Sequence, residues 1–319
     1  MRHWKTASSH QTLFENPFYI EDLRVLDAGM LQHILSHAQF GITLEEWACA
    51  VHDASYIVID HLRQCMAPKQ REYFTRLLQL PYDSEQSKRI RKQILDQLFW
   101  ELTYWKTPEL YEALTEGEHL HAGIFQSLEP DIHAHIVLDA GAGSGRATIE
   151  CLRAGAGRVY AVEPSPGLLR ILRRKLLAQE GGERVIVAQG RFEALPLEDQ
   201  SVDVALSCSA FTAEAEQGGE EGLRELRRVT RRGGKIVIIW PRSEDRAWLE
   251  AHGFRYVFLP IVQEMKVTFP SLQDALFCAR RFYAHNPAVT HHLLATQCPE
   301  VPFSVIGLEP PHYYCWLQV

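Results

Sequence analysis

A ten-residue stretch decides the fold of this chain: Val137-Leu138-Asp139-Ala140-Gly141-Ala142-Gly143-Ser144-Gly145-Arg146. A short apolar run, residues 136–138, leads an acidic residue into three glycines that alternate with other residues. A segment with helical periodicity begins at Arg146. The pattern predicts a strand, a tight turn and a helix start, which is the layout of a loop that binds a nucleotide cofactor. Glycine suits this turn because the backbone must bend sharply and approach a ligand without an intervening side chain.

A second apolar run ends in a carboxylate at a fixed distance from the loop. Residues 159–163 read Val-Tyr-Ala-Val-Glu, and Glu163 lies 22 residues after Gly141. An acid at the carboxyl end of the second strand is placed to accept both hydroxyls of a ribose. Hydrogen bonds to a charged acceptor are the stronger kind, so Glu163 favours a ribose and disfavours a cofactor with a 2′-phosphate.

More apolar runs follow, and they are expected to form further strands at residues 184–189, 201–207, 235–240, 255–259 and 313–317. Strands that are apolar throughout are typical of a parallel sheet covered on both faces. Their alternation with helical segments predicts a doubly wound α/β domain. Residues 265–269 are expected to extend or pair with this sheet, and Ser271 with Asp274 to start a helix that runs to about residue 285.

Taken together, residues 105–260 resemble the class I S-adenosylmethionine-dependent methyltransferases. The dinucleotide-binding fingerprint would require a third glycine at position 146, where Arg146 stands. The resemblance implies a Rossmann-like sheet, mostly parallel with an antiparallel last strand, and S-adenosylmethionine as cofactor. The residues that it predicts at the cofactor are Asp139, Gly141, Ala142, Gly143, Gly145, Glu163, Pro164, Arg191, Phe192 and Ser207. A different nucleotide-binding α/β domain remains the alternative.

The adenine contact departs from the pattern of these relatives. Many of them carry an acid that meets the adenine amino group where this chain has Arg191-Phe192. Either the Phe192 ring packs on the adenine face, or the backbone of residues 191–192 contacts the edge of the base.

The first hundred residues have a different character. Apolar residues recur there at spacings of three and four, as at Leu44, Trp47 and Val51. We predict a helical accessory domain over residues 1–100, with Ser84 capping one helix, and a methyltransferase domain over residues 101–319. The short helices and the basic helix after Pro81 are similar to the small helical domains of flagellar motor switch proteins. A protein partner, self-association and a purely stabilising extension are open roles for this region.

An aromatic cluster joins the two regions. Its members are Trp100, Tyr104, Trp105 and Tyr111. In related methyltransferases the helix before the glycine loop covers the methionine end of the cofactor, often with an aromatic residue. Aromatic residues at helical spacing more often belong to a core, and this is the interpretation that we favour here.

The composition excludes several classes of protein. The chain has 319 residues, 46% hydrophobic and 23% charged, and a formal net charge of −7, which does not favour bulk nucleic-acid binding. It lacks an uninterrupted apolar run of about 18 residues, so no membrane span is expected. Residues 1–6 lack the apolar core of a secretory signal. The seven cysteines are scattered and never form a C-x-x-C pair, which argues against disulfides and structural zinc and favours the cytoplasm.

The acceptor of the methyl group is expected beyond the strands at 201–207 and 235–240. The Asn/Asp-Pro-Pro-aromatic motif of enzymes that methylate DNA bases or glutamine is missing there. Cys208 is interpreted as a packing residue, with a reactive thiolate as the alternative. We interpret the histidines at 119, 121, 133 and 135 as surface residues and the arginine-rich helices as solvated faces, and we assign no metal ligand.

These observations predict a cytoplasmic S-adenosylmethionine-dependent methyltransferase that acts on a small molecule by in-line displacement. The protein must then mainly hold the nucleophile against the methyl carbon, and no catalytic residue is assigned. Two alternatives stay open: a catalytically inactive module of the same fold that senses the cofactor or binds a partner, and an RNA methyltransferase.

Overall fold

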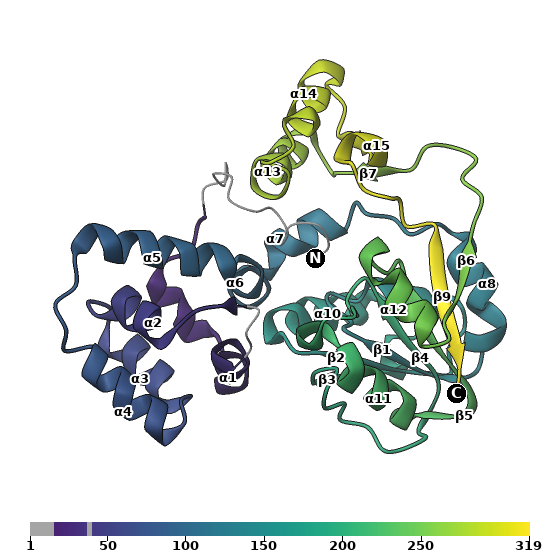
Figure 1. The fold of residues 1–319 in the computed structure, drawn as a ribbon. Coiled ribbons are helices and arrows are strands. Elements are labelled where there is room, and N and C mark those ends of the chain that lie inside the picture. The colour runs from purple at the N-terminus through teal and green to yellow at the C-terminus, as the bar shows by residue number, and fades with distance from the viewer. Residues whose placement is uncertain (1–15, 37–39) are drawn as a thin grey trace. The chain divides into compact units, whose positions relative to one another are not determined.

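The computed structural model describes residues 16–36 and 40–319, and these form two units (Figure 1). A helical unit extends to Pro108, and an α/β unit comprises Glu109 to Val319. The division therefore follows residue 108, whereas the sequence predicts it after residue 100. The N-terminal segment in which a secretory signal was sought, residues 1–6, lies outside the described residues.

The helical unit consists of short helices around its own core. Its elements are the 3-10 helix η1 (Ile20–Val25) and the α-helices α1 (Ala28–Ser36), α2 (Leu44–Val51), α3 (Tyr56–Gln64), α4 (Pro68–Leu77), α5 (Ser84–Gln97) and α6 (Phe99–Lys106). Helix α2 packs against α4 and α5, and Trp47, Phe74 and Leu98 are fully buried. The burial of large apolar side chains supplies most of the stability of helices as short as these.

Caps decide where these helices begin. The Thr43 hydroxyl accepts a hydrogen bond from the Glu46 N–H (3.2 Å), and the Glu46 carboxylate accepts one from the Thr43 N–H (2.8 Å). Helix α5 is capped by Asp83, whose carboxylate accepts the Gln86 N–H at 2.9 Å. The prediction that Ser84 caps this helix was wrong, because Ser84 is already its first helical residue.

The aromatic cluster divides between the two units. Trp100, Tyr104 and Trp105 lie on α6 and are buried within the helical unit, where Trp100 and Tyr104 stack with ring centroids 5.9 Å apart. Tyr111 belongs to α7 of the α/β unit. The prediction that these aromatic residues belong to a core is thus confirmed for Trp100, Tyr104 and Trp105. Tyr111 does not join them, because it lies on α7.

The α/β unit contains a seven-stranded sheet with helices around it. The strands of the whole unit, of which β7 and β8 form a separate pair, are β1 (Ile136–Ala140), β2 (Arg158–Glu163), β3 (Val185–Gln189), β4 (Val202–Cys208), β5 (Thr230–Ile239), β6 (Arg255–Phe258), β7 (Lys266–Thr268), β8 (Glu300–Pro302) and β9 (Tyr313–Gln318). Its α-helices are α7 (Pro108–Thr115), α8 (Gly123–Ile132), α9 (Arg146–Arg153), α10 (Pro166–Ala178), α11 (Gly219–Val229), α12 (Arg246–Ala251), α13 (Leu272–Phe282), α14 (Pro287–Thr296) and α15 (Phe303–Ile306). Short 3-10 helices are η3 (Gly182–Arg184), η4 (Ala215–Gln217) and η5 (Ser243–Asp245).

The strand order confirms the predicted fold class. The sheet runs β3-β2-β1-β4-β5-β9-β6, with parallel pairing from β3 to β5 and with β9 antiparallel to both β5 and β6. Because β2 and β4 flank β1, the order of the strands reverses there, and the loops on the two sides of β1 diverge and leave a crevice at the carboxyl ends of the strands. This edge is where an open α/β sheet binds its ligand.

Residues 259–312, which we call the β6–β9 segment, leave the sheet after β6 and return at β9. The expectation that residues 265–269 join the main sheet was wrong. Strand β7 pairs instead with β8, and the buried pair Val267 and Val301 forms the middle of this separate two-stranded sheet. Ser271 caps α13 by accepting the Asp274 N–H at 3.1 Å, which confirms the predicted helix start. Figure 1 shows α13, α14 and α15 gathered away from α11.

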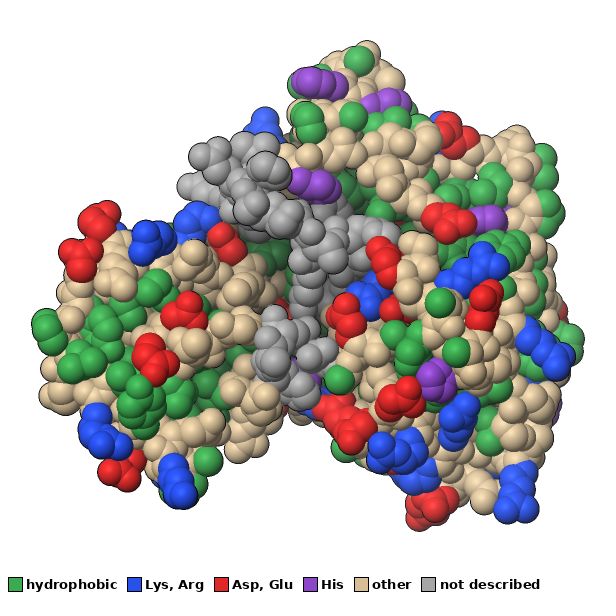
Figure 2. All heavy atoms as spheres, viewed as in Figure 1, with side chains coloured by type: hydrophobic (Ala, Val, Ile, Leu, Met, Phe, Trp, Pro, Cys, Tyr) green, Lys and Arg blue, Asp and Glu red, His purple; other side chains and the backbone are tan. Residues whose placement is uncertain are grey.

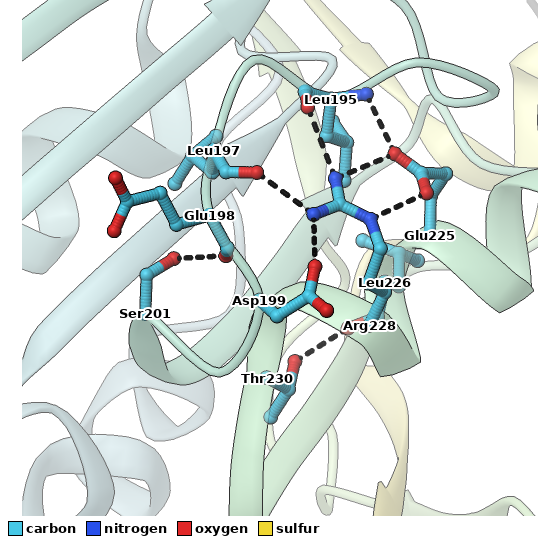
Figure 3. Close-up of polar contacts among 9 residues, drawn as sticks. All are labelled: Leu195, Leu197, Glu198, Asp199, Ser201, Glu225, Leu226, Arg228 and Thr230. Carbon is cyan, nitrogen blue, oxygen red and sulfur yellow. Dashed lines mark hydrogen bonds and ion pairs between the residues drawn. The ribbon is translucent and has the colours of Figure 1, made fainter.

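Arg228 on α11 holds the loop that follows β3 against this helix (Figure 3). Its guanidinium donates to the carbonyls of Leu195 (3.1 Å) and Leu197 (2.8 Å) and to the carboxylates of Glu225 (2.6 and 2.8 Å) and Asp199 (2.8 Å). Glu225 also accepts the Leu195 N–H at 3.0 Å. The arginine is therefore a structural cation that fastens a loop.

We expect Arg228→Ala to lower the free energy of unfolding by about 2 kcal/mol, because it removes charge-assisted hydrogen bonds that tie two segments together. The matched control is Arg224→Ala on the same helix. Arg224 is 73% exposed and its contact with Glu221 is 3.8 Å long, so its loss should change the stability by less than about 0.5 kcal/mol. Urea unfolding followed by tryptophan fluorescence compares the two variants, and equal stabilities would contradict the assignment.

Candidate functional site

The glycine loop between β1 and α9 adopts the backbone that its sequence requires. Gly141, Gly143 and Gly145 have φ angles of 72°, 56° and 95°, in the left-handed region that favours glycine. The N–H groups of Gly141 and Ala142 donate to the Val162 carbonyl at 2.8 and 3.0 Å, so the loop is fixed to the end of β2. A Cβ on Gly141 would lie 2.6 Å from the Ala210 Cβ, which shows how closely the backbone is approached at this point.

Asp139, the last acidic residue before the loop, is fully buried at the end of β1. Its Oδ2 accepts the Thr148 hydroxyl at 2.6 Å, whereas its Oδ1 has no hydrogen-bond partner among the described residues. Burial raises the pKa of Asp139 to about 6, against the opposing effect of the Thr148 hydrogen bond. An unsatisfied buried carboxylate oxygen is costly, and a cationic ligand would satisfy it.

Glu163 joins the loop to the end of β2. Its Oε2 accepts the Gly143 N–H at 3.0 Å and its Oε1 accepts the Ser165 N–H at 2.9 Å. Each oxygen keeps a second lone pair, so two hydroxyl groups can still bind to the oriented carboxylate. Burial raises the pKa of Glu163 to about 7, and the two backbone hydrogen bonds act in the opposite direction.

Two aromatic rings lie against the glycine loop. The Tyr111 Cε1 atom is 3.9 Å from the position that a Cβ on Gly143 would occupy. The Phe192 Cζ atom is 3.0 Å from the equivalent position at Gly141, and its ring meets Phe211 edge-on with centroids 5.4 Å apart. Phe192 is thus partly packed into the core as well as close to the loop.

The other predicted cofactor residues lie around the same edge. Pro164 follows Glu163 directly, and its carbonyl accepts the Gln189 side-chain amide at 3.0 Å. Arg191 pairs with Ala194 in an isolated bridge after β3. Ser207 is fully buried, and its hydroxyl accepts the Phe211 N–H at 3.2 Å, so its side chain shapes the turn after β4.

The comparisons with known proteins agree with this geometry. Residues 137–234 match the family described as "Methyltransferase domain". The chain is 33% identical over 116 residues to an uncharacterized methyltransferase-like protein of Schizosaccharomyces pombe, which covers 36% of this chain and 42% of that protein. It is 32% identical over 121 residues to an uncharacterized methyltransferase of Mycobacterium bovis, covering 38% and 46%. Residues 137–234 are thus similar to methyltransferase domains.

The matches extend over part of the chain only. This chain spans less than half the length of these two curated relatives. A solved structure of an S-adenosylmethionine-dependent methyltransferase from Aquifex aeolicus is 20% identical, with a TM-score of 0.39, and covers 47% of this chain and 89% of that one.

The residues at this edge of the sheet fit S-adenosylmethionine. The fit depends on two features of the described residues: the unpartnered Oδ1 of Asp139, which suits the ammonium of a methionine moiety, and the free lone pairs of Glu163, which suit ribose hydroxyls.

A further group at this edge was not singled out from the sequence. The guanidinium of Arg146, the first residue of α9, donates to the Glu118 carbonyl (3.1 Å), the Glu118 carboxylate (3.3 Å) and the Ser209 hydroxyl (3.1 Å). It also lies 5.8 Å from the centroid of the Trp240 ring. The one local signal is the arginine in place of the third glycine of the dinucleotide fingerprint, which excludes that fingerprint but does not indicate the contacts of the side chain.

The histidines ahead of the loop do not assemble a metal site. No group of three or more His, Cys, Asp or Glu side chains in residues 16–36 and 40–319 is arranged to hold a metal ion. The Nδ1 atom of His121 accepts the Gly123 N–H at 3.1 Å, which gives this side chain a place in a turn.

We expect the affinity for S-adenosylmethionine to fall by about tenfold between pH 8 and pH 6. Glu163 must be a carboxylate to accept the ribose hydroxyls, and with a pKa of about 7 it becomes protonated as the pH falls through this range. Binding should therefore release protons below pH 7. Calorimetric titrations in two buffers with different ionisation enthalpies measure both quantities.

The control for this experiment is Glu163→Gln, which should bind the cofactor more weakly at pH 8 and should remove most of the pH dependence above pH 6.5. The pKa of about 6 at Asp139 accounts for a residual decline below that value. An affinity that is constant from pH 8 to pH 6 in the unmodified protein would contradict the role of Glu163.

Proposed function

We propose that this protein transfers the methyl group of S-adenosylmethionine to a small-molecule acceptor. The observation that carries the proposal is the combination of a left-handed glycine loop, the oriented carboxylate of Glu163 and the unpartnered Oδ1 of Asp139 at one edge of the sheet. A buried carboxylate oxygen without a hydrogen-bond partner destabilises the protein, so a domain that no longer bound its cofactor would be expected to lose it.

The chemistry requires little beyond positioning. The cofactor supplies a methyl group that its sulfonium charge already activates. Asp139 would bind the ammonium of the cofactor's amino-acid part, and Glu163 would bind its ribose hydroxyls. Gly141 and Gly143 would allow the backbone to approach the cofactor closely. The acceptor nucleophile must then be held in line with the methyl carbon, and this alignment removes much of the entropic barrier.

The covered acceptor edge supports a small molecule over a macromolecule. Trp240, directly after β5, donates its indole N–H to the Glu309 carbonyl at 2.9 Å and meets the Phe303 ring edge-on at 5.9 Å. The backbone of the β6–β9 segment also bonds to the loop before α8, through Thr268 N–H to Gly117 O at 3.1 Å. An acceptor that reaches the ends of β4 and β5 must fit beside this segment.

The charge distribution does not favour RNA. Several of the arginines carry their own partners: Arg170 on α10 bonds to Glu109, Arg224 on α11 lies near Glu221, and Arg228 on α11 bonds to Glu225 and Asp199. Arg231, expected from the sequence on a helix, lies in β5 instead and bonds to Asp203. On the face shown in Figure 2, Lys and Arg side chains are interspersed with Asp and Glu over the α/β unit. Neutralised pairs of this kind attract a polyanion weakly.

The proposed location is the cytoplasm. All seven cysteines lie in the described part of the chain and are free thiols, as a reducing compartment maintains them. Within residues 16–36 and 40–319 there is no helix with the length and apolar character needed to cross a bilayer.

Titration with S-adenosylmethionine and, separately, with NAD tests the cofactor. We expect micromolar affinity for the first and no binding of the second. Glu163→Ala should weaken the binding of S-adenosylmethionine by about 1.5–3 kcal/mol, the size of a hydrogen bond to a charged group. Glu163→Gln is the control for shape. Binding of NAD in preference to S-adenosylmethionine would refute the proposal.

Turnover is tested with radiolabelled methyl donor and a library of small-molecule acceptors. Recovery of the radiolabelled methyl group in one of these acceptors would support the proposed methyltransferase activity. Tight binding of S-adenosylmethionine without transfer to any acceptor would replace the proposal with the inactive, cofactor-sensing alternative.

We expect Cys208→Ala to retain the methyl-transfer rate to within about twofold. The Cys208 thiol lies 3.7 Å from the Ser209 hydroxyl, and within the described residues no histidine or carboxylate bonds to it as an activating base. A packing cysteine of this kind tolerates loss of its sulfur. A rate reduced a hundredfold or more, in a variant that melts at the same temperature, would show that the thiol takes part in the reaction.

A further inference from the structure

Arg146 extends from the glycine loop toward the acceptor side of the sheet. It is the first residue of α9, after β1, and its guanidinium reaches Ser209 beyond β4 and Trp240 beyond β5. Its side chain is 21% exposed, and Glu118, which holds it from the opposite side, is 13% exposed. The cation therefore lies along the carboxyl ends of three neighbouring strands rather than in solvent.

The two residues that it contacts beyond the strands have strained backbones. Ser209 has a φ of 63° and Trp240 a φ of 51°, and each is the first residue after its strand. The left-handed region is unfavourable for a non-glycine residue, and a bulky tryptophan is a rare occupant. Strain at two adjacent strand ends that share one guanidinium indicates a site held in shape for a ligand.

The hydrogen bonds of Arg146 leave one edge of the guanidinium available. Its Nη1 is used twice by Glu118, and its Nη2 donates once, to Ser209. Within the described residues its Nε–H and the second Nη2–H form no hydrogen bond. An Nε–H and an Nη2–H on the same edge of a guanidinium can bind a carboxylate through two parallel hydrogen bonds.

From this geometry we infer that Arg146 binds a carboxylate group of the methyl acceptor. The inference rests on the proposed function and narrows its acceptor to small molecules that carry a carboxylate. The cofactor's polar groups have partners further back, at Glu163 and at the Oδ1 of Asp139. Arg146 reaches past them to the ends of β4 and β5, from which the acceptor must approach.

Substitution of Glu118 distinguishes a role of Arg146 in binding an anion from a purely structural role. Its backbone carbonyl and its carboxylate both hold Arg146, so its charge opposes an anionic ligand while its carbonyl keeps the guanidinium in place. Glu118→Gln should therefore strengthen the binding of a carboxylate, and Arg146→Gln should weaken it. If the pair only fastened two loops together, both variants would weaken the site alike.

The test uses the full chain saturated with S-adenosylhomocysteine and calorimetric titration with paired acids and amides: benzoate and benzamide, indole-3-acetate and indole-3-acetamide, hexanoate and hexanamide. Inorganic phosphate is titrated alongside to separate carboxylates from anions in general. We expect at least one acid to bind tenfold or more tightly than its amide and more tightly than phosphate. Arg146→Gln should abolish this preference, Arg146→Lys should retain only part of it because an ammonium lacks the fork, and Glu118→Gln should increase it.

Three results would overturn the inference. The first is an unmodified protein with no preference for any acid over its amide. The second is a preference that survives in Arg146→Gln. The third is a loss of S-adenosylhomocysteine affinity in Arg146→Gln with unchanged affinity for 5′-methylthioadenosine, which would assign Arg146 to the cofactor's own carboxylate. Each is distinct from failure of the proposed function, which would appear earlier as an absence of S-adenosylhomocysteine binding to the unmodified protein.

Discussion

The buried carboxylate of Glu163 holds the cofactor edge of the sheet together. It accepts one N–H from the glycine loop and one from the start of the next connection, so the end of β2, the Gly143 turn and Ser165 share a single acceptor group. Without these bonds, the backbone N–H groups of Gly143 and Ser165 would lose their acceptor, and the second of these bonds is buried. The same burial that makes the carboxylate a good organiser raises its pKa to about 7 and makes its ionisation costly. A ligand whose hydroxyl groups donate hydrogen bonds to this carboxylate offsets part of the cost of its ionisation.

The sheet order places this edge at a topological switch. Strand β1 lies between β2 and β4, so the loops on its two sides diverge and leave a crevice at their carboxyl ends. The β6–β9 segment then covers the part of the edge beyond β5, through Trp240 and the turn at Gly117. The site is thus divided into a cofactor side, built by the first half of the α/β unit, and an acceptor side, to which residues near its end contribute.

Much of the fold was predictable because its signals are local. Continuous apolar runs, which are typical of buried parallel strands, identified β1 to β5, and three glycines in ten residues identified the loop. The signals failed where pairing depends on distant partners. Strand β7 is three residues long, and only the position of β8, more than thirty residues later, decides that it leaves the main sheet. The cap of α5 was missed because Asp83 and Ser84 are both good capping residues and geometry chooses between them.

The sequence by itself determined the class of fold, the identity of the loop and the residues proposed at the cofactor, since these depend on spacings of a few residues along one strand–turn–helix unit. Tertiary structure alone decided the acceptor side. Arg146 bonds to residues 28 and 63 positions away, and no spacing in the chain announces that Glu118, Ser209 and Trp240 meet at one guanidinium. Local patterns report how a segment folds, whereas a site is made by side chains that parallel strands bring to a common edge.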